Sequence, residues 1–244
     1  MLAGGDNLTA VGGPVPAGAR LSSPIGADPA VGVAAPATAA RTGWRGKRLL
    51  DVVVSSLLVL LALPVLAAIA LAIKLTSPGP VLFRQRRVGR HGTDFSILKF
   101  RTMFIDAEAQ LQSNEQLQRL FLDGSHKIPS RIDPRVTRVG RFLRRTSLDE
   151  LPQFFNVLVG HMSLVGPRPV ERTQLERDYQ GFEPAYLELR PGLTGLWQVS
   201  GRSTVQFPER AELDTRYLAT CGPWVDTKIL ARTPLVIVTG LGAD

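Results

Sequence analysis

Residues 52–73 form a continuous stretch without a charged side chain, and this stretch constrains the fold more than any other feature of the sequence. Only Ser55, Ser56 and Pro64 interrupt its aliphatic and alanine residues. As an α-helix rising about 1.5 Å per residue it would extend roughly 33 Å, and the hydrocarbon core of a bilayer is about 30 Å thick. The sequence therefore predicts a helix that enters a membrane. A buried helix of a soluble protein is disfavoured, because uncharged runs of this length are unusual there.

Basic side chains flank this helix at both ends. The flanking cations are Arg41, Arg45, Lys47 and Arg48 before it, and Lys74, Arg84, Arg86, Arg87 and Arg90 after it. A helix that spans a bilayer usually has its basic bias on one side only. Pro64 cannot donate a hydrogen bond to the carbonyl of Leu60, so it predicts a kink. From these residues two interpretations stay open: a kinked re-entrant helix with both ends on one side of the membrane, and an ordinary transmembrane anchor.

The first forty residues differ from the rest of the chain in composition. Their only charges are Asp6, Arg20 and Asp28, although the whole chain carries a formal net charge of +8. Alanine, glycine, proline and valine follow there without a helical or alternating pattern, so we expect 1–40 to be a flexible low-complexity tail. It lacks the basic and leucine-rich regions of a secretory signal. Residues 41–244 are then expected to form one membrane-associated domain, and the one cysteine, Cys221, excludes an internal disulfide.

Three further segments have recognisable patterns. Residues 81–88 and 93–100 read as two strands of a β-hairpin around a four-residue loop bounded by Gly89 and Gly92. Residues 108–123 predict an exposed helix that ends before Gly124. Residues 224–240 are apolar but interrupted by charges, which favours an amphipathic helix in the membrane interface with Trp224 as an anchor. The expected class is α+β, a mostly helical single domain with a small antiparallel hairpin, a kinked re-entrant N-terminal membrane helix and C-terminal interfacial helices.

An arginine-rich run leads into an acidic pair and is the strongest candidate for chemistry. In RIDPRVTRVGRFLRRTSLDE, residues 131–150, six arginines including Arg144 and Arg145 precede Asp149 and Glu150. The Ser147-x-x-Glu150 spacing is a capping-box pattern, which predicts both carboxylates in the first turn of a new helix. Nearby guanidinium groups would favour their ionised forms, and an ionised carboxylate beside arginines suits attack on a phosphate. Ordinary helix capping and surface pairing explain the same pattern, and Pro152 indicates a helix that begins one or two residues later.

Two loops have the composition of anion-binding turns. Residues 166–169, GPRP, present Arg168 on a rigid turn, and residues 190–202 combine glycines, hydroxyls and Arg202. Neither matches a Walker or dinucleotide motif, so structural turns explain them equally. Lys99 and Arg101 in KFRTM would add positive charge if the hairpin folded over the same site.

Taken together, these motifs resemble the bacterial sugar transferase family, the monotopic phosphoglycosyl transferases, over residues 45–243. The resemblance rests on ordered blocks: KLTSPGPVLFRQRRVG, LKFRTM, DPRVTRVGRFLRRTSLDELPQFFNVLVGHMSLVGPRP, RPGLTGLWQVSGR, LDTRY and DTKILARTP. It implies transfer of a sugar 1-phosphate from a UDP-sugar to polyprenyl phosphate, with UMP released, at the cytoplasmic face of the inner membrane. Such reactions prime exopolysaccharide, capsule or O-antigen synthesis.

The same resemblance implies roles for individual residues. Asp149 would be the nucleophile that carries a covalent phosphosugar, and Glu150 would be the ligand of Mg²⁺. The residues expected to bind substrate are Lys99, Arg101, Arg144, Arg145, Arg168, Arg202 and Asp214. The resemblance also implies a re-entrant helix, although members often have Ser before the helix-breaking proline and this chain has Leu63. A preceding multi-helix membrane domain, found in longer relatives, is not expected here.

One alternative comes from another class of protein. A membrane-tethered basic protein without catalytic activity would use the same cations to bind nucleic acid or anionic lipid. An acidic pair inside the basic run opposes the nucleic-acid interpretation, so membrane lipids and the two phosphorylated substrates are the expected partners. The transferred sugar, the pathway and whether the chain forms a homo-oligomer are not encoded in these motifs.

Overall fold

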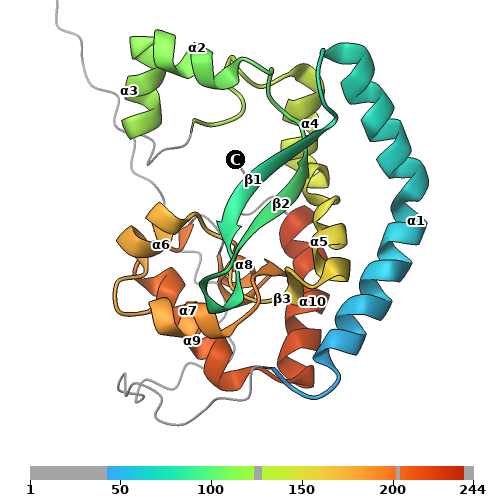
Figure 1. Cartoon of the computed structure of the whole chain (residues 1–244), viewed down its shortest axis with the longest axis vertical. Helices are drawn as coiled ribbons and strands as arrows, with labels where there is room; N and C mark the ends of the chain where they lie inside the picture. Colours follow the sequence, from blue (N-terminus) through green and yellow to red (C-terminus); the bar gives the residue numbers. More distant parts are fainter. Residues whose placement is uncertain (1–42, 124–127, 202–203, 239–244) are drawn as a thin grey trace, which may run out of the picture. The chain divides into compact units, whose positions relative to one another are not determined.

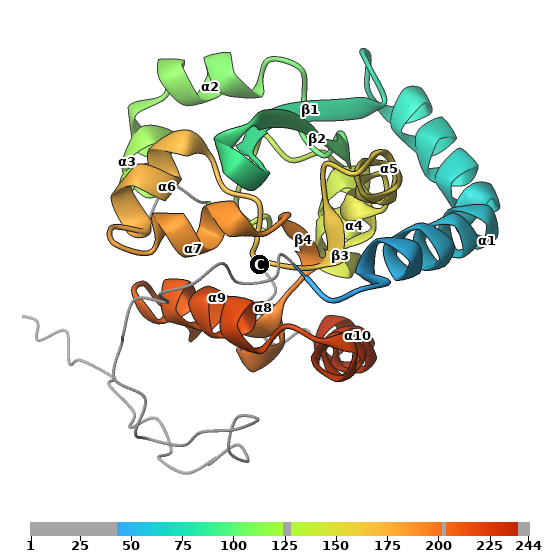
Figure 2. The same ribbon diagram turned by 60° about the horizontal axis from the view of Figure 1, so that its bottom comes forward.

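The long uncharged stretch folds as one continuous helix, α1 (Lys47–Thr76), in a computed structural model of the chain. The structure describes residues 43–123, 128–201 and 204–238, and all of them belong to a unit that begins at Ala37. The predicted tail at 1–40 lies outside the described residues. Figures 1 and 2 show α1 changing direction part-way along its length, as the proline predicts. Pro64 lies inside the helix, near its middle.

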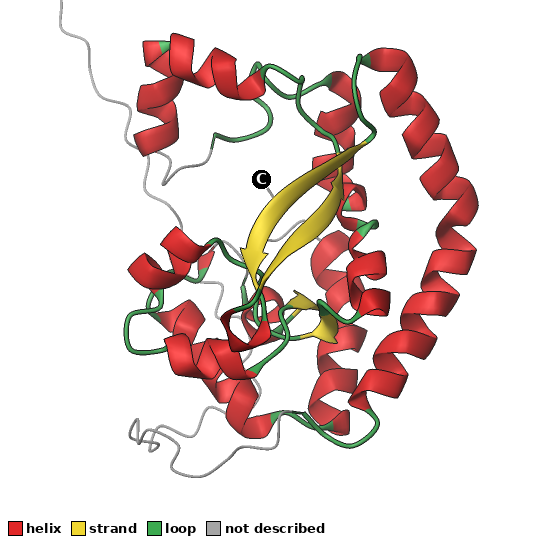
Figure 3. Ribbon diagram, in the orientation of Figure 1, coloured by secondary structure: helices red, strands yellow, loops and turns green. Residues whose placement is uncertain are grey.

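The other elements are short, and most are helical (Figure 3). After α1 come β1 (Leu82–Val88), a 3₁₀ turn (Arg90–Gly92), β2 (Asp94–Phe100), α2 (Ala107–Ser113), α3 (Glu115–Asp123), α4 (Arg138–Thr146), a second 3₁₀ turn, η2 (Leu148–Glu150), and α5 (Gln153–Val159). The C-terminal part contains β3 (Ser163–Val165), α6 (Arg172–Asp178), α7 (Glu183–Glu188), β4 (Gly192–Thr194), α8 (Leu196–Ser200), α9 (Glu209–Thr220) and α10 (Pro223–Val238). The predicted α+β class, mostly helical with a small antiparallel sheet, is confirmed.

The hairpin β1–β2 is the antiparallel sheet that the alternating pattern predicts. Its register pairs Val88 with Asp94 and Phe83 with Lys99, so the loop is one residue longer than expected. A second sheet was not predicted: β3 and β4 pair in parallel, with Val165 opposite Thr194. Both strands have three residues, which is too short for a pattern of alternation to stand out.

Residues 108–123 form two helices rather than the single helix predicted. Asn114 leaves the helical region, with φ −121° and ψ 103°, and ends α2. Its side-chain Oδ1 then accepts hydrogen bonds from the backbone N–H groups of Gln116 and Leu117, which caps the start of α3. The tendency of asparagine to bond nearby backbone explains the break.

Helix α1 packs against α5, α4 and β3, and its ends are anchored differently. Near its C-terminal end, Ile69 and Ile73 pack with Phe100 and Leu143 in an apolar cluster. Near its N-terminal end, Asp51 is buried and accepts hydrogen bonds from the Ser163 hydroxyl and the Leu164 N–H, at 3.1 and 3.0 Å. Between these anchors the helix leaves most of its apolar surface uncovered.

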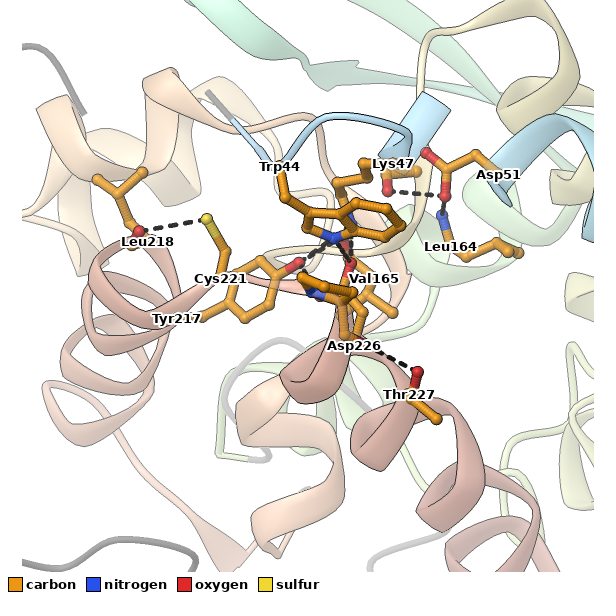
Figure 4. A network of polar contacts seen from close by, with 12 residues as sticks. Trp44, Lys47, Asp51, Leu164, Val165, Tyr217, Leu218, Cys221, Asp226 and Thr227 are labelled. Carbon is orange, nitrogen blue, oxygen red and sulfur yellow. Dashed lines mark hydrogen bonds and ion pairs between the residues drawn. The ribbon is translucent and has the colours of Figure 1, made fainter. Parts of the chain in front are cut away.

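A buried polar network joins the start of α1 to α9 and α10 (Figure 4). The carboxylate of Asp226 is 1% exposed and accepts hydrogen bonds from Trp44 Nε1, Lys47 Nζ and Tyr217 Oη at 3.0, 2.6 and 2.6 Å. Asp226 is one of the charges that interrupt the apolar stretch predicted as an interfacial helix, and its carboxylate is buried in the protein. Trp224, in contrast, is exposed at the start of α10.

Candidate active site

Asp149 and Glu150 lie in the 3₁₀ turn η2, between α4 and α5. Ser147 ends α4 in the left-handed conformation, with φ 56° and ψ 17°, and its side chain makes no capping hydrogen bond. The predicted capping box is therefore wrong, and the carboxylates do not occupy the first turn of an α-helix. Pro152 was expected to delay the start of the helix by one or two residues, but α5 begins at Gln153, five residues after the Leu148 that a Ser147 N-cap would imply.

The hairpin delivers a cation to this acidic pair. Strand β2 packs against η2, and Lys99 Nζ lies 2.8 Å from Glu150 Oε1. The Lys99 side chain is 20% exposed and the Glu150 side chain is 27% exposed. The hairpin therefore brings Lys99 to the acidic pair, and the binding of substrate by Lys99 stays a prediction.

Arg144, from the last turn of α4, is the member of the arginine run that acts electrostatically on Asp149. Its guanidinium donates from Nε to Thr102 Oγ1 at 2.9 Å and reaches Ser130 Oγ from a terminal nitrogen at 3.4 Å. These two hydroxyls orient the cation without neutralising it. Its positive charge therefore stays available to the acidic pair.

The other arginines of the run do not gather around the carboxylates. Arg135 forms a buried ion pair with Asp133 at 2.9 Å, and Arg141 donates to the Ser130 carbonyl at 3.2 Å. Four are exposed, namely Arg131, Arg138, Arg141 and Arg145. The run is therefore divided among structural, exposed and site positions, which weakens the interpretation of it as one continuous nucleic-acid footprint.

Asp149 is nine-tenths buried, and its pKa is raised to about 6. Burial is the largest cause and repulsion by Glu150 adds to it, whereas Lys99 and Arg144 act in the opposite direction. The sequence analysis expected the arginines to favour the ionised form of Asp149. Arg144 does so, but the loss of solvation has the larger effect and raises the pKa. The carboxylate nevertheless remains largely ionised at neutral pH, and it is a poorly solvated anion, which increases its reactivity.

A polar pocket lies beside the acidic pair. It is lined by Arg87, Ile97, Lys99, Glu150, Gln153, Arg168, Pro169, Gly192, Leu193 and Gln198. Arg87 was not predicted as a site residue. Its side chain is largely buried near Glu171, at 3.4 Å, and burial lowers the pKa of its guanidinium below the usual value. Three cations from separate segments therefore surround a space next to Glu150, an arrangement suited to a diphosphate.

The two glycine-containing loops meet at this pocket, although they are separate in the sequence. The Gly166 N–H donates to the Thr194 carbonyl at 2.9 Å, and the Gly192 N–H donates to the Pro167 carbonyl at 2.7 Å. A Cβ on Gly192 would lie 2.1 Å from the Gly166 nitrogen, so the close approach of the two backbones requires glycine. This pairing places Arg168 at the pocket, as predicted.

Two further predicted residues, Arg101 and Asp214, do not line the pocket. Arg101 donates to the Ser77 carbonyl and hydroxyl at 2.9 and 2.8 Å, which fixes the end of α1. Asp214 is buried in α9 and accepts a hydrogen bond from Tyr179 Oη at 2.8 Å. Both contacts favour structural roles, and a role of either residue in substrate binding stays a prediction. Arg202 lies outside the described residues.

Comparison with known proteins identifies the family. The sequence profile of the bacterial sugar transferase family matches residues 42–240 of this chain. The chain belongs to the bacterial sugar transferase family. Among related bacterial sugar transferases, the undecaprenyl-phosphate galactose phosphotransferase of Salmonella typhimurium is 43% identical over 201 residues, covering 81% of this chain and 41% of that protein.

Two shorter members of the bacterial sugar transferase family match as well. The UDP-glucose:undecaprenyl-phosphate glucose-1-phosphate transferase of Caulobacter vibrioides is 46% identical over 79% of this chain and 70% of its own length. The exopolysaccharide production protein ExoY of Rhizobium meliloti is 41% identical over 78% of this chain and 84% of its own length. This chain spans about two fifths of the length of the longer relatives that it matches.

Proposed function

We propose that this chain transfers a sugar 1-phosphate from a UDP-sugar to undecaprenyl phosphate, with Asp149 as the nucleophile. The observation that carries the proposal is the buried Asp149 carboxylate beside Glu150, Lys99 and Arg144, and Glu150 and Lys99 also line a pocket with Arg87 and Arg168. The related transferases, which are named for undecaprenyl phosphate and for galactose or UDP-glucose, supply the substrate classes. Synthesis of exopolysaccharide or another surface glycan is the proposed setting.

The proposed reaction proceeds in two displacements at one phosphorus. An Asp149 carboxylate oxygen attacks the phosphorus that bears the sugar, and the bond to the bridging oxygen breaks, so UMP leaves with that oxygen. An oxygen of undecaprenyl phosphate then attacks the same phosphorus, and the Asp149 carboxylate is released. One carboxylate thereby serves both half-reactions, and the product is a lipid diphosphate sugar.

The cations of the pocket have a defined task in both displacements. Arg87, Lys99 and Arg168 approach from the hairpin and from the 166–169 loop, where they would offset the charge of the diphosphate. Arg144, in the last turn of α4, would stabilise the ionised form of Asp149. Positioned cations in a poorly solvated site stabilise phosphoryl transfer strongly.

Mg²⁺ is the proposed cofactor, held by Glu150 with Asp149. Two adjacent carboxylates fit this ion, because Mg²⁺ binds oxygen ligands and commonly completes its shell with substrate phosphates and water. Within residues 43–123, 128–201 and 204–238, no group of three or more His, Cys, Asp or Glu side chains could hold a metal alone. A bound ion would neutralise part of the phosphate charge.

We further propose that α1 is a re-entrant membrane helix and that the chain lies on the cytoplasmic face of the inner membrane. In the described part of the chain, α1 is the one helix long and apolar enough to cross a bilayer, and only 11% of its most apolar window is buried in the protein. Both of its flanks are basic, and the helix, which contains Pro64, changes direction part-way along its length (Figure 2). Trp224, exposed at the start of α10 with Lys228 over its ring, supports an interfacial position for that helix.

Release of UMP from a panel of UDP-sugars, measured with undecaprenyl phosphate and Mg²⁺, tests the proposed activity. UMP should form over many turnovers with at least one UDP-sugar, and this sustained release should require undecaprenyl phosphate, because without it each enzyme molecule stops at the covalent intermediate. Formation of UMP in the Asp149→Asn variant at near-normal rate would contradict the role of Asp149.

Cysteine labelling tests the topology. In a Cys221→Ser background, Arg45→Cys and His91→Cys place single thiols before and after α1 at exposed positions. A re-entrant helix predicts that an impermeant reagent modifies both thiols from the cytoplasmic side. Modification from opposite sides would establish a helix that spans the bilayer.

A further inference from the structure

Two glutamine side chains of the pocket carry polar atoms without a partner. Gln153 is 2% exposed and Gln198 is 8% exposed, and both line the pocket beside Glu150. Among the described residues, none forms a hydrogen bond with Gln153 Nε2 or with Gln198 Oε1. A buried amide atom without a partner costs about 1–3 kcal/mol, so two of them on residues that line one pocket require an explanation.

The backbone keeps these amides in place. Gln153 is the first residue of α5, one turn after Asp149, and Gln198 lies in the middle of the short helix α8. A Cβ on Gly195 would lie 2.5 Å from Gln198 Oε1 and 2.2 Å from the Gly166 carbonyl oxygen. Because Gly195 has no Cβ, there is room for the Gln198 amide beside it.

We propose that Gln153 and Gln198 bind hydroxyl groups of the sugar and thereby determine which sugar is transferred. A hydroxyl group accepts one hydrogen bond and donates another, which complements an unpaired amide N–H and an unpaired amide oxygen. The cations of the pocket are suited to the phosphates, whereas these two neutral amides are suited to an uncharged group. This inference rests on the proposed function, because it requires a sugar next to the phosphorus that Asp149 attacks.

The position of the amides favours the sugar over the nucleotide base. Gln153 follows Asp149 by one turn, and Glu150 lines the same pocket, so the amides lie close to the reacting phosphorus. The sugar is attached directly to that phosphorus, whereas the base is separated from it by a second phosphate and a ribose. The experiment must therefore distinguish recognition of the sugar from recognition of the base.

The experiment combines deoxy donors with two substitutions of similar side-chain length. UDP-sugars lacking a single sugar hydroxyl are compared with the intact donor in wild type, Gln153→Met and Gln198→Met. In wild type, one deoxy donor should lose at least 10-fold in kcat/KM, because the amides are left unpaired. Each variant should lose 10- to 100-fold with the intact donor but less than 3-fold with that deoxy donor, whereas inhibition by UMP should stay unchanged.

The melting temperature of the variants separates recognition from a structural role. Methionine fills the space without an unpaired polar atom, so both variants should melt at or above the wild-type temperature. Equal losses with all donors, a parallel loss of UMP binding, or no deoxy donor that costs wild type more than 3-fold would each overturn the inference. The wild-type scan needs no variant, so the lack of any such deoxy donor overturns the inference even where a variant fails to fold.

These outcomes are distinguishable from failure of the proposed function. If wild type transfers no sugar phosphate from any UDP-sugar, the proposed function fails first. If wild type is active but shows no coupling between a sugar hydroxyl and these amides, only the assignment of Gln153 and Gln198 fails.

Discussion

Lys99 Nζ lies 2.8 Å from Glu150 Oε1, and this ion pair connects the β-hairpin to the turn that carries both candidate catalytic carboxylates. The residues are 51 positions apart in the chain, so the contact is a product of the fold. It also limits the electrostatic cost of two adjacent buried acids, since Lys99 lowers the pKa of Asp149.

Lys99→Met should reduce kcat at least 10-fold, because it removes a cation from the pocket and leaves the acidic pair less compensated. Arg86→Met is the matched control. Arg86 pairs with Ser96 and Arg87 with Phe95, so Arg86 lies on the opposite face of β1 from Arg87 and is exposed. Rates of UMP release should fall only in the first variant. Equal rates in the two variants would remove Lys99 from the site.

Asp149→Asn should abolish turnover and also raise the melting temperature of the metal-free protein by roughly 5 °C. The folded-state pKa of about 6 exceeds the ordinary 3.8, so the folded state favours the protonated acid. That stability is complete below about pH 4 and is lost as the pH rises through 6. Because asparagine does not ionise, the variant should not lose this stability at pH 7.5. Differential scanning fluorimetry in EDTA would measure it, and a lower melting temperature would contradict the assigned cost of ionising Asp149.

Asp226→Ala should destabilise the protein by about 3 kcal/mol, because it leaves the Lys47 ammonium buried without its counter-ion. The control is Asp178→Ala, which removes the surface pair with Arg177 at 2.7 Å and should change stability by less than about 0.5 kcal/mol. Thermal unfolding in one detergent compares the two. Similar small effects would show that the network of Figure 4 does not anchor α1.

Asp214→Asn should make thermal stability less dependent on pH. Burial raises the pKa of Asp214 to about 7, against the opposing effect of the hydrogen bond from Tyr179. Wild type should therefore lose about 1.4 kcal/mol per pH unit between about pH 4 and pH 7 through this group, whereas asparagine cannot ionise. Melting curves at pH 5 and pH 8 test this. An equal decrease in both proteins would contradict the pKa assigned to Asp214.

The sequence was sufficient where its signal was local and strong. The uncharged run predicted α1, Pro64 predicted its bend, and the alternating residues predicted the β1–β2 hairpin. The capping box failed because Ser147 adopts a left-handed conformation that ends α4, and a residue pattern does not distinguish this from an N-cap.

The pocket residues that were missed depend on register and tertiary contacts. A four-residue loop would pair Val88 with Thr93, but the structure pairs Val88 with Asp94. Since side chains alternate along a strand, that difference of one residue decides whether Arg87 shares a face with Lys99. Gln153 and Gln198 were missed because unpaired amides become visible only when neighbouring side chains are placed.

The central claim, that Asp149 carries the sugar phosphate, is tested most directly by intact-protein mass spectrometry. The enzyme is incubated with Mg²⁺ and a UDP-sugar that it turns over, without undecaprenyl phosphate, and then with it. The account predicts a mass increase of one sugar phosphate that maps to Asp149, disappears on addition of undecaprenyl phosphate and is absent in Asp149→Asn. An active enzyme that never acquires this mass, or an adduct that persists in Asp149→Asn, would contradict it.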